Sequence, residues 1–198
     1  MKRFFTGAAL VLALAGCGSQ NYDVPEINKF LTDLSQVYVS DFKGPNPDDV
    51  IKIDFAVKRL CIDKPDAFAV DGRDMSVSSD IVHAKSDEYF AYPIAEDKPT
   101  SEVDIADGKY VIMKTNEQRF AFSKVSEIIA SKNDTIMLNA DVYDCAAGWK
   151  GDINSDPKSW ETVDPNNIPL KNKKMRVVLV KKDKSYRILS YVNASSVH

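Results

Sequence analysis

The spacing of apolar residues changes once along this chain of 198 residues, and that change limits the folds open to it. Before about residue 100, apolar side chains recur every three or four residues, which is the period of an amphipathic helix. From about Ser101 onward they alternate with polar side chains, which is the period of a half-buried strand. Helices followed by strands predict an α+β fold, with N-terminal helices packed on an antiparallel sheet.

Three helices are expected in the first half of the chain. The first lies within residues 24–42, where its apolar positions have helical spacing (Ile27, Phe30, Leu31, Leu34, Val37 and Tyr38). The second runs from Pro47 to about Cys61, with Asn46 as its N-cap and the proline at its first helical position. Ser78 or Ser79 caps the third helix, which covers about residues 80–90.

The second half predicts hairpins. Residues 101–114 turn near residues 106–108, residues 119–130 and 135–145 flank a polar turn, and residues 174–192 turn near residues 182–184. Short connections make the sheet antiparallel, and we expect one curved sheet of about five or six strands. This element order resembles the NTF2-like and cystatin-like architecture, whose helices pack in the concavity of the sheet. The resemblance implies no particular function, because such domains include enzymes, binding modules and inert partners.

The amino terminus has the layout of a secretory signal. Lys2 and Arg3 precede an apolar stretch over residues 4–15, which ends in small residues and is too short to span a membrane. Leu14-Ala15-Gly16-Cys17 resembles the lipobox of bacterial lipoproteins. That resemblance implies a thioether-linked diacylglycerol on Cys17, cleavage after Gly16, and usually a further fatty acid such as palmitate on the new amino terminus.

This reading divides the chain into three parts. Residues 1–16 are the signal peptide, residues 17–23 a lipidated tether, and residues 24–198 a single α+β domain. Two or three acyl chains hold a protein firmly at a bilayer, so the membrane is its first partner. By resemblance, Gly18 after Cys17 favours the outer membrane in a Gram-negative cell; in a Gram-positive cell the anchor is the outer face of the cell membrane.

Cys61 and Cys145 are the two cysteines left once Cys17 is lipidated. In an exported protein such a pair predicts a disulfide, which on the chain-entropy model stabilises by roughly 4–5 kcal/mol. The alternative is that both thiols are buried and reduced. Neither is favoured as a nucleophile, because no histidine lies near either cysteine in sequence to form the thiolate.

The connection over residues 146–172 is longer than a compact fold needs. Trp149 and Trp160 within it are candidate anchors for an envelope protein or a glycan, since exposed aromatic residues concentrate binding energy. The alternative is that both tryptophans fold the loop back as a lid on the sheet.

The same connection contains a weak candidate metal site. Asp152, Asn154 and Asp156 copy the first three ligand positions of a calcium-binding loop. Pro157 then stands where such a loop requires glycine, and Val163 stands where it requires a bidentate acid. No cofactor is predicted.

Charge is unevenly placed along the chain. The whole chain carries −3, yet residues 171–187, here called the basic strip, hold eight Lys and Arg against Asp183 alone. The basic strip suits anionic lipid headgroups or an acidic partner, or simply forms the exposed face and turn of a hairpin. Nucleic acid is excluded as a partner by the acidic total and the exported compartment.

No catalytic residue is assigned. The chain has two histidines, His83 and His198, so a histidine-based metal cluster or catalytic triad lacks members. We therefore expect a lipid-anchored, non-enzymatic module that binds a partner or stabilises an envelope assembly. Two alternatives stay open: a small-ligand carrier or enzyme with an NTF2-like cavity between helices and sheet, and a calcium-steadied surface binder built on the tryptophan loop.

Overall fold

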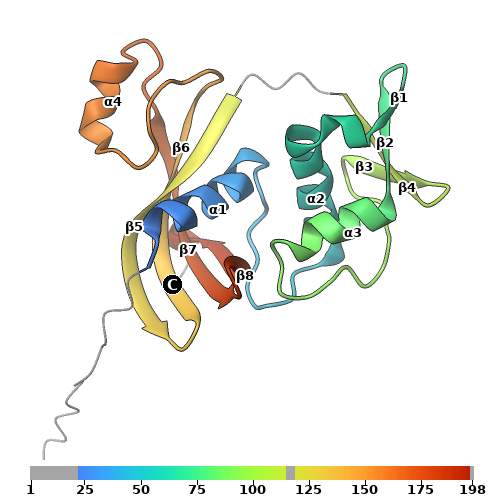
Figure 1. Ribbon diagram of the computed structural model, residues 1–198, viewed down its shortest axis with the longest axis horizontal. Coiled ribbons are helices and arrows are strands. Elements are labelled where there is room, and N and C mark those ends of the chain that lie inside the picture. Colours follow the sequence, from blue (N-terminus) through green and yellow to red (C-terminus); the bar gives the residue numbers. More distant parts are fainter. Residues whose placement is uncertain (1–21, 115–118, 197–198) are drawn as a thin grey trace, which may run out of the picture.

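The computed structural model describes residues 22–114 and 119–196 and confirms an α+β fold (Figure 1). Within these residues the strands form two antiparallel sheets of four strands each, so the expectation of one curved sheet of five or six strands is wrong. Sequence period shows which residues face a core but leaves open which strands pair, and this is why the division into two sheets was missed.

Three of the four described helices lie close to their expected positions, and the fourth, within the connection over residues 146–172, was not predicted. They are α1 (Val24–Gln36), α2 (Asp49–Asp63), α3 (Ser79–Asp87) and α4 (Pro157–Val163), with single 3₁₀ turns at Pro65–Ala67 and Ala194–Ser196. The first sheet has the order β1 (Ala69–Asp71), β2 (Asp74–Ser78), β4 (Lys109–Met113) and β3 (Val103–Ala106). The second has the order β5 (Arg119–Lys132), β6 (Thr135–Ala146), β7 (Leu170–Lys182) and β8 (Ser185–Asn193).

Two helix ends differ from expectation. Helix α2 is capped by Asp48 and not by Asn46, because the Asp48 carboxylate accepts a hydrogen bond from the Val50 amide at 2.9 Å. Asn46 instead accepts a hydrogen bond from the Lys52 ammonium at 3.0 Å. Helix α1 stops at Gln36 and does not reach residue 42, and Tyr38 just beyond it takes a positive φ of 51°, which no helical residue adopts.

Helix α1 closes the free edge of the second sheet. Asn28 Oδ1 accepts a hydrogen bond from the Val125 amide at 2.7 Å, and Thr32 Oγ1 accepts one from the Ser123 amide at 3.1 Å. Ser35, one turn further on, shares a hydroxyl–hydroxyl hydrogen bond with Ser123. Because β5 is an edge strand, Asn28 and Thr32 satisfy amides that would otherwise be left unpaired or be open to another chain.

The first three helices are joined by a charged network centred on Arg59. Its guanidinium contacts Asp63 at 2.5 Å on α2 and Asp33 at 3.1 Å on α1, and Lys85 of α3 contacts Asp63 at 3.3 Å. Burial raises the pKa of Asp33, and the nearby Arg59 charge opposes that rise. The network therefore fixes α1, α2 and α3 relative to one another.

The two sheets meet through this helical layer. Figure 1 shows α1 against the second sheet and α2 and α3 beside the first. Phe42, after α1, pairs with Tyr191 of β8, and Phe90, after α3, pairs with Ile188 of the same strand. The apolar side chains between the layers form one core, in which Phe55 packs edge-on against Tyr89 and Phe90.

Candidate functional site

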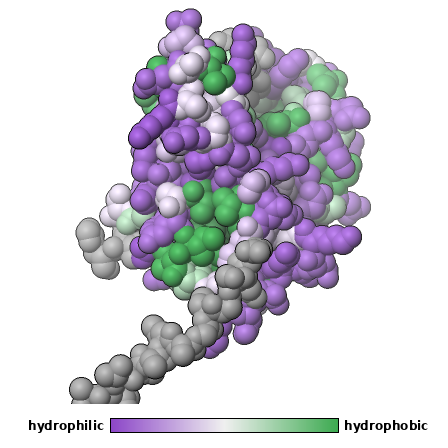
Figure 2. All heavy atoms as spheres, turned by 60° about the vertical axis from the view of Figure 1, so that its left-hand side comes forward, coloured by the Kyte–Doolittle hydropathy of each residue, from purple (hydrophilic) through white to green (hydrophobic). Residues whose placement is uncertain are grey.

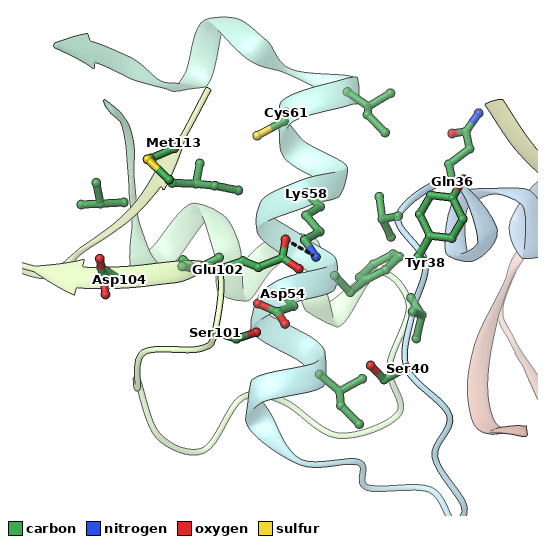
Figure 3. A pocket seen from close by; sticks show the side chains of 18 of the residues that line it. Gln36, Tyr38, Ser40, Asp54, Lys58, Cys61, Ser101, Glu102, Asp104 and Met113 are labelled. Carbon is green, nitrogen blue, oxygen red and sulfur yellow. Dashed lines mark ion pairs between the residues drawn. The ribbon is translucent and has the colours of Figure 1, made fainter. Parts of the chain in front are cut away.

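The described residues form a groove of about 920 Å³. Its walls are residues 36–40 at and just after the end of α1, one face of α2, residues 101–104 at the start of β3, residues 111–113 at the end of β4, and Asp74 of β2. Figure 3 shows α2 running through the site, with the strands of the first sheet on one side and Tyr38 on the other. We call this site the groove.

The local sequence explains how α2 lines the groove. Six of its residues, Ile51, Asp54, Phe55, Lys58, Cys61 and Ile62, face the site and recur at helical spacing. The segment leading into β3 is held against this face through Thr100. The Thr100 hydroxyl donates a hydrogen bond to the Asp54 carboxylate and accepts one from the Val103 amide at 3.0 Å. Helix and strand are therefore locked together at one wall.

The polar groups of the groove are mainly acidic. Asp54, Asp74, Glu102 and Asp104 supply four carboxylates against the single ammonium of Lys58, a formal charge of −3. Lys58 Nζ lies 2.8 Å from Glu102 Oε2, and this ion pair crosses the groove from α2 to the start of β3 (Figure 3). A positively charged group is therefore favoured inside the groove.

Apolar side chains of the groove are open to solvent. Met113 at the end of β4 is 68% exposed, and Ile62 at the end of α2 is 51% exposed. Tyr38, from the segment after α1, lies on the other side of α2 from Met113 (Figure 3). Apolar surface beside acidic groups is the composition of a surface that binds another molecule.

Catalytic chemistry has little support in the groove. Burial raises the pKa of the Cys61 thiol above its ordinary value of 9.0, so the thiol is protonated at neutral pH. Lys58 is held in its ion pair, Asp54 accepts the Thr100 hydrogen bond, and no histidine is among the described residues that line the site. The arrangement favours binding over nucleophilic or acid–base chemistry.

The structure does not form the predicted disulfide: Cys61 and Cys145 are both free thiols. The physical reason is their placement, since Cys61 lies on α2 beside the first sheet and Cys145 lies near the end of β6 in the second. Cys145 Sγ donates a hydrogen bond to the Phe120 carbonyl oxygen at 3.4 Å. Burial and then the nearby Asp144 charge raise the pKa of Cys145 to about 11, so this thiol is also protonated.

The predicted tryptophan anchors are packed into the protein. Trp160 on α4 is 1% exposed and meets Phe122 of β5 edge-on at a centroid distance of 5.3 Å. Trp149 is half-buried and stacks on the same Phe122 ring at 4.8 Å. The interpretation of both residues as exposed recognition anchors is therefore wrong, and the lid alternative is confirmed.

The predicted calcium ligands do not converge. The Asp152 carboxylate accepts a hydrogen bond from the Asn154 amide at 2.8 Å, Asn154 Oδ1 accepts one from the Asn28 side chain, and Asp156 caps α4 through the Lys158 amide. Among the residues with described positions, no group of three His, Cys, Asp or Glu side chains is placed to hold a metal ion. The calcium interpretation is therefore wrong, because these side chains form the turn and the start of α4 instead.

His83 on α3 is partly exposed. Its ring Nε2 is 2.6 Å from Asp97 Oδ1, and the Tyr110 hydroxyl donates a hydrogen bond to the same oxygen. These hydrogen bonds, from Tyr110 first and then His83, lower the pKa of Asp97. The cluster ties the segment after α3 to β4 and lies outside the groove.

The residues that line the groove were not predicted as a site. Five separate segments supply them, and no motif links those segments in sequence. The one available signal was Met113, a large apolar residue at the end of a strand beside polar neighbours. Cys17 and the rest of the lipobox lie outside the described residues.

Comparison with known proteins returned no match: no family model, no curated protein and no solved structure is similar to this chain. Over the described ranges, no helix has the length and apolar character needed to cross a bilayer. What the protein does is therefore inferred from the sequence and from the groove.

Proposed function

We propose that this protein is a lipid-anchored extracytoplasmic lipoprotein whose groove binds a partner at the cell envelope. The lipobox ending at Cys17, placed at the end of a secretory signal, supports the anchor. The observation that carries the binding role is the combination, in one groove of about 920 Å³, of exposed Met113 and Ile62 with a net charge of −3. By the same resemblance, Gly18 points to the outer membrane in a Gram-negative cell.

The composition of the groove defines the partner by its chemistry. A segment with positive charges and at least one large apolar side chain complements both the carboxylates and the exposed Met113. An envelope protein is the favoured source of such a segment. A glycan has less support, because Trp160 of α4, one of its two candidate anchors, is buried.

A second candidate function is supported by the volume of the groove. About 920 Å³ lies within the range of pockets that take small ligands, roughly 300–1,000 Å³. We associate the NTF2-like or cystatin-like fold with this candidate function, because the expected ligand site is a cavity between helices and sheet. It is supported by the packing of α1 along β5 of a four-stranded antiparallel sheet. A carrier fits the groove better than an enzyme with a cysteine nucleophile does, because burial raises the pKa of the Cys61 thiol and keeps it protonated.

The anchor is tested by replacing Cys17 with serine and labelling cells with a radioactive fatty acid. Label should be lost from Cys17→Ser, because no other residue carries the acyl thioether. Cys61→Ser is the matched control and should keep the label. Label that persists on Cys17→Ser would rule out the lipobox interpretation.

The groove is tested with a photo-crosslinking amino acid placed at Met113 in cells. Val70 of β1 is the matched control, because it is 62% exposed in the same sheet but does not line the groove. We expect an adduct of defined mass at position 113, absent at position 70, and reduced by Asp104→Lys, which repels a positively charged segment. Equal adducts at both positions, or none at either, would contradict partner binding in the groove.

Native mass spectrometry of the purified protein tests the small-ligand candidate. A carrier should show a bound mass that is lost on denaturation and absent from Met113→Asp. A spectrum with the protein mass alone, together with an adduct at position 113 in cells, favours the protein partner.

A further inference from the structure

The strand order places two turns at the same end of the second sheet. The β5–β6 turn follows Lys132, and the β7–β8 turn follows Lys182. Thr135 pairs with Val180, and the Lys181 amide donates a hydrogen bond to the Asp134 carbonyl oxygen at 2.8 Å. Residues 132–135 and 181–185 therefore form one surface, which we call the turn end.

The amino-terminal end of α1 lies beside the turn end. Phe30 of α1 contacts the ring of Tyr186, which follows directly after the β7–β8 turn, at a centroid distance of 6.1 Å. Burial raises the pKa of Tyr186, and the negative charges of Glu26 and Asp23, at the start of α1, raise it further. These residues are therefore close enough to interact electrostatically.

The length of the chain before α1 limits where the turn end lies in the cell. Cys17 precedes Tyr22, the first described residue, by five residues, which span at most about 18 Å when fully extended. Acyl chains on Cys17 would therefore keep Tyr22 within about 18 Å of the bilayer, and Val24 at the start of α1 within about 25 Å. The surface beside the start of α1 is the turn end.

The charge of the turn end suits an anionic bilayer. Its four lysines, Lys132, Lys181, Lys182 and Lys184, are all exposed. Two acids, Asp134 and Asp183, leave the turn end with a charge of +2 on a chain whose total is −3. At about 0.1 M salt the Debye length is about 10 Å, so a nearby bilayer responds to these local charges more than to the total.

The basic strip divides into two parts in the structure. At its upper end Lys171 and Lys174 both contact Asp141, at 2.7 and 3.9 Å, which neutralises part of the charge there. At its lower end, Lys181, Lys182 and Lys184 take part in no ion pair with any residue whose position is described, and the same holds for Lys132 in the neighbouring turn. The lower part is the one left available to an external anion.

Exposed apolar side chains lie beside the turn end. Ile128 and Ile129 of β5 and Met137 of β6 are exposed on the hairpin that carries the β5–β6 turn. Figure 2 shows apolar side chains gathered on the lower half of the face that these strands present. Apolar residues next to lysines are the composition of surfaces that lie in the interface of a bilayer.

We infer that the turn end is a membrane-docking surface, which lies against anionic phospholipid headgroups and orients the domain on the bilayer. This inference rests on the proposed lipid anchor at Cys17, which brings the surface to the membrane. The lysines bind headgroup phosphates, and the exposed apolar side chains of the β5–β6 hairpin contact the acyl boundary. A lysine near such a surface contributes roughly fivefold in affinity.

The test measures vesicle binding of the full chain carrying Cys17→Ser, so that it does not depend on lipidation. Vesicles are made of phosphatidylcholine alone or with phosphatidylglycerol, and bound protein is separated by flotation. The apolar stretch over residues 4–15 contributes to binding on both lipids and in every variant. Lys182→Glu/Lys184→Glu is compared with Lys150→Glu/Lys158→Glu, which changes the net charge equally at exposed positions in the 146–169 connection.

We expect the parent chain to bind phosphatidylglycerol vesicles more tightly than neutral ones, with binding that falls as salt is added. The turn-end variant should lose roughly 30-fold in affinity for the anionic vesicles, and the control variant should stay within about threefold of the parent. Equal binding of the parent to both lipids, or equal losses in both variants, would overturn the docking surface. Fatty-acid labelling at Cys17 reports separately on the anchor, so failure of one inference is distinguishable from failure of the other.

Discussion

Replacing Trp160 with alanine tests whether the 146–169 connection belongs to the folded core. The side chain is 1% exposed and meets Phe122, Tyr143 and Trp149 edge-on, with centroid distances of 5.3, 5.0 and 5.6 Å. Its ring Nε1 donates hydrogen bonds to the Asp152 carbonyl oxygen at 3.1 Å and to the Ser155 hydroxyl at 2.9 Å. Alanine removes all of these contacts and leaves a cavity under α4.

The expected loss follows from those contacts. Truncating a fully buried tryptophan costs about 3–5 kcal/mol of unfolding free energy, a range that includes the cavity left behind. The aromatic pairs and two hydrogen bonds place Trp160→Ala within that range. In a chain of this size each kcal/mol lowers the melting temperature by about 2–4 °C, so we expect a drop of roughly 6–20 °C.

Urea denaturation followed by circular dichroism measures the loss without relying on tryptophan fluorescence. Trp160→Phe keeps a ring in the cluster and removes the Nε1 donor, so it should cost less than alanine does. Val163→Ala, at the last residue of α4 and 51% exposed, is the control and should change stability by less than about 0.5 kcal/mol. A loss below about 1 kcal/mol for Trp160→Ala would show that the connection opens independently of the sheet.

Two further predictions concern titratable groups. Thiol counting on denatured, unreduced protein should find Cys61 and Cys145 both free, because the structure places Cys61 on α2 beside the first sheet and Cys145 on β6 of the second; a count of zero at these two positions would refute that placement. Hydrogen bonding from Tyr110, and then from His83, lowers the pKa of Asp97 in the folded state below its ordinary value of 3.8. Ionised Asp97 therefore stabilises the protein at pH values above 3.8, and this stabilisation is lost as the pH falls through the lowered pKa. The stability gap between the parent and Asp97→Asn should therefore be largest near pH 6 and shrink below about pH 4, and a gap that grows with acid would contradict the shift.

Local sequence rules located most elements because those elements carry strong local signals. The hairpin turn at residues 106–108 forms as predicted: Ala106 pairs with Lys109, and Asp107 and Gly108 take the positive φ that such turns require. An N-cap residue followed by proline marks the start of one helix but not of another. It begins α4 at Asp156-Pro157, whereas at Asn46-Pro47 the helix starts two residues later, because Asp48 offers a competing cap.

The two sheets were beyond local rules because strand pairing is a long-range property. Strand β1 is exposed at all three of its residues, so it lacks the alternation of buried and exposed side chains that indicates a strand. The polar stripe Asn28, Thr32 and Ser35 on α1 was a readable signal, since polar residues at that spacing on a buried helix face need partners. Its partners, the amides of β5, are about 90 or more residues away in sequence.

The placement of the groove relative to the turn end makes the two proposed surfaces compatible. The walls of the groove come from the segment after α1, from α2 and from the first sheet, whereas the turn end belongs wholly to the second sheet. No described residue lines both surfaces, so seating the turn end on a bilayer covers no wall of the groove. Lys182→Glu/Lys184→Glu should consequently leave the adduct at position 113 in place, and Asp104→Lys should leave vesicle binding unchanged. A variant at one surface that weakens the other would show that the bilayer itself occupies the groove.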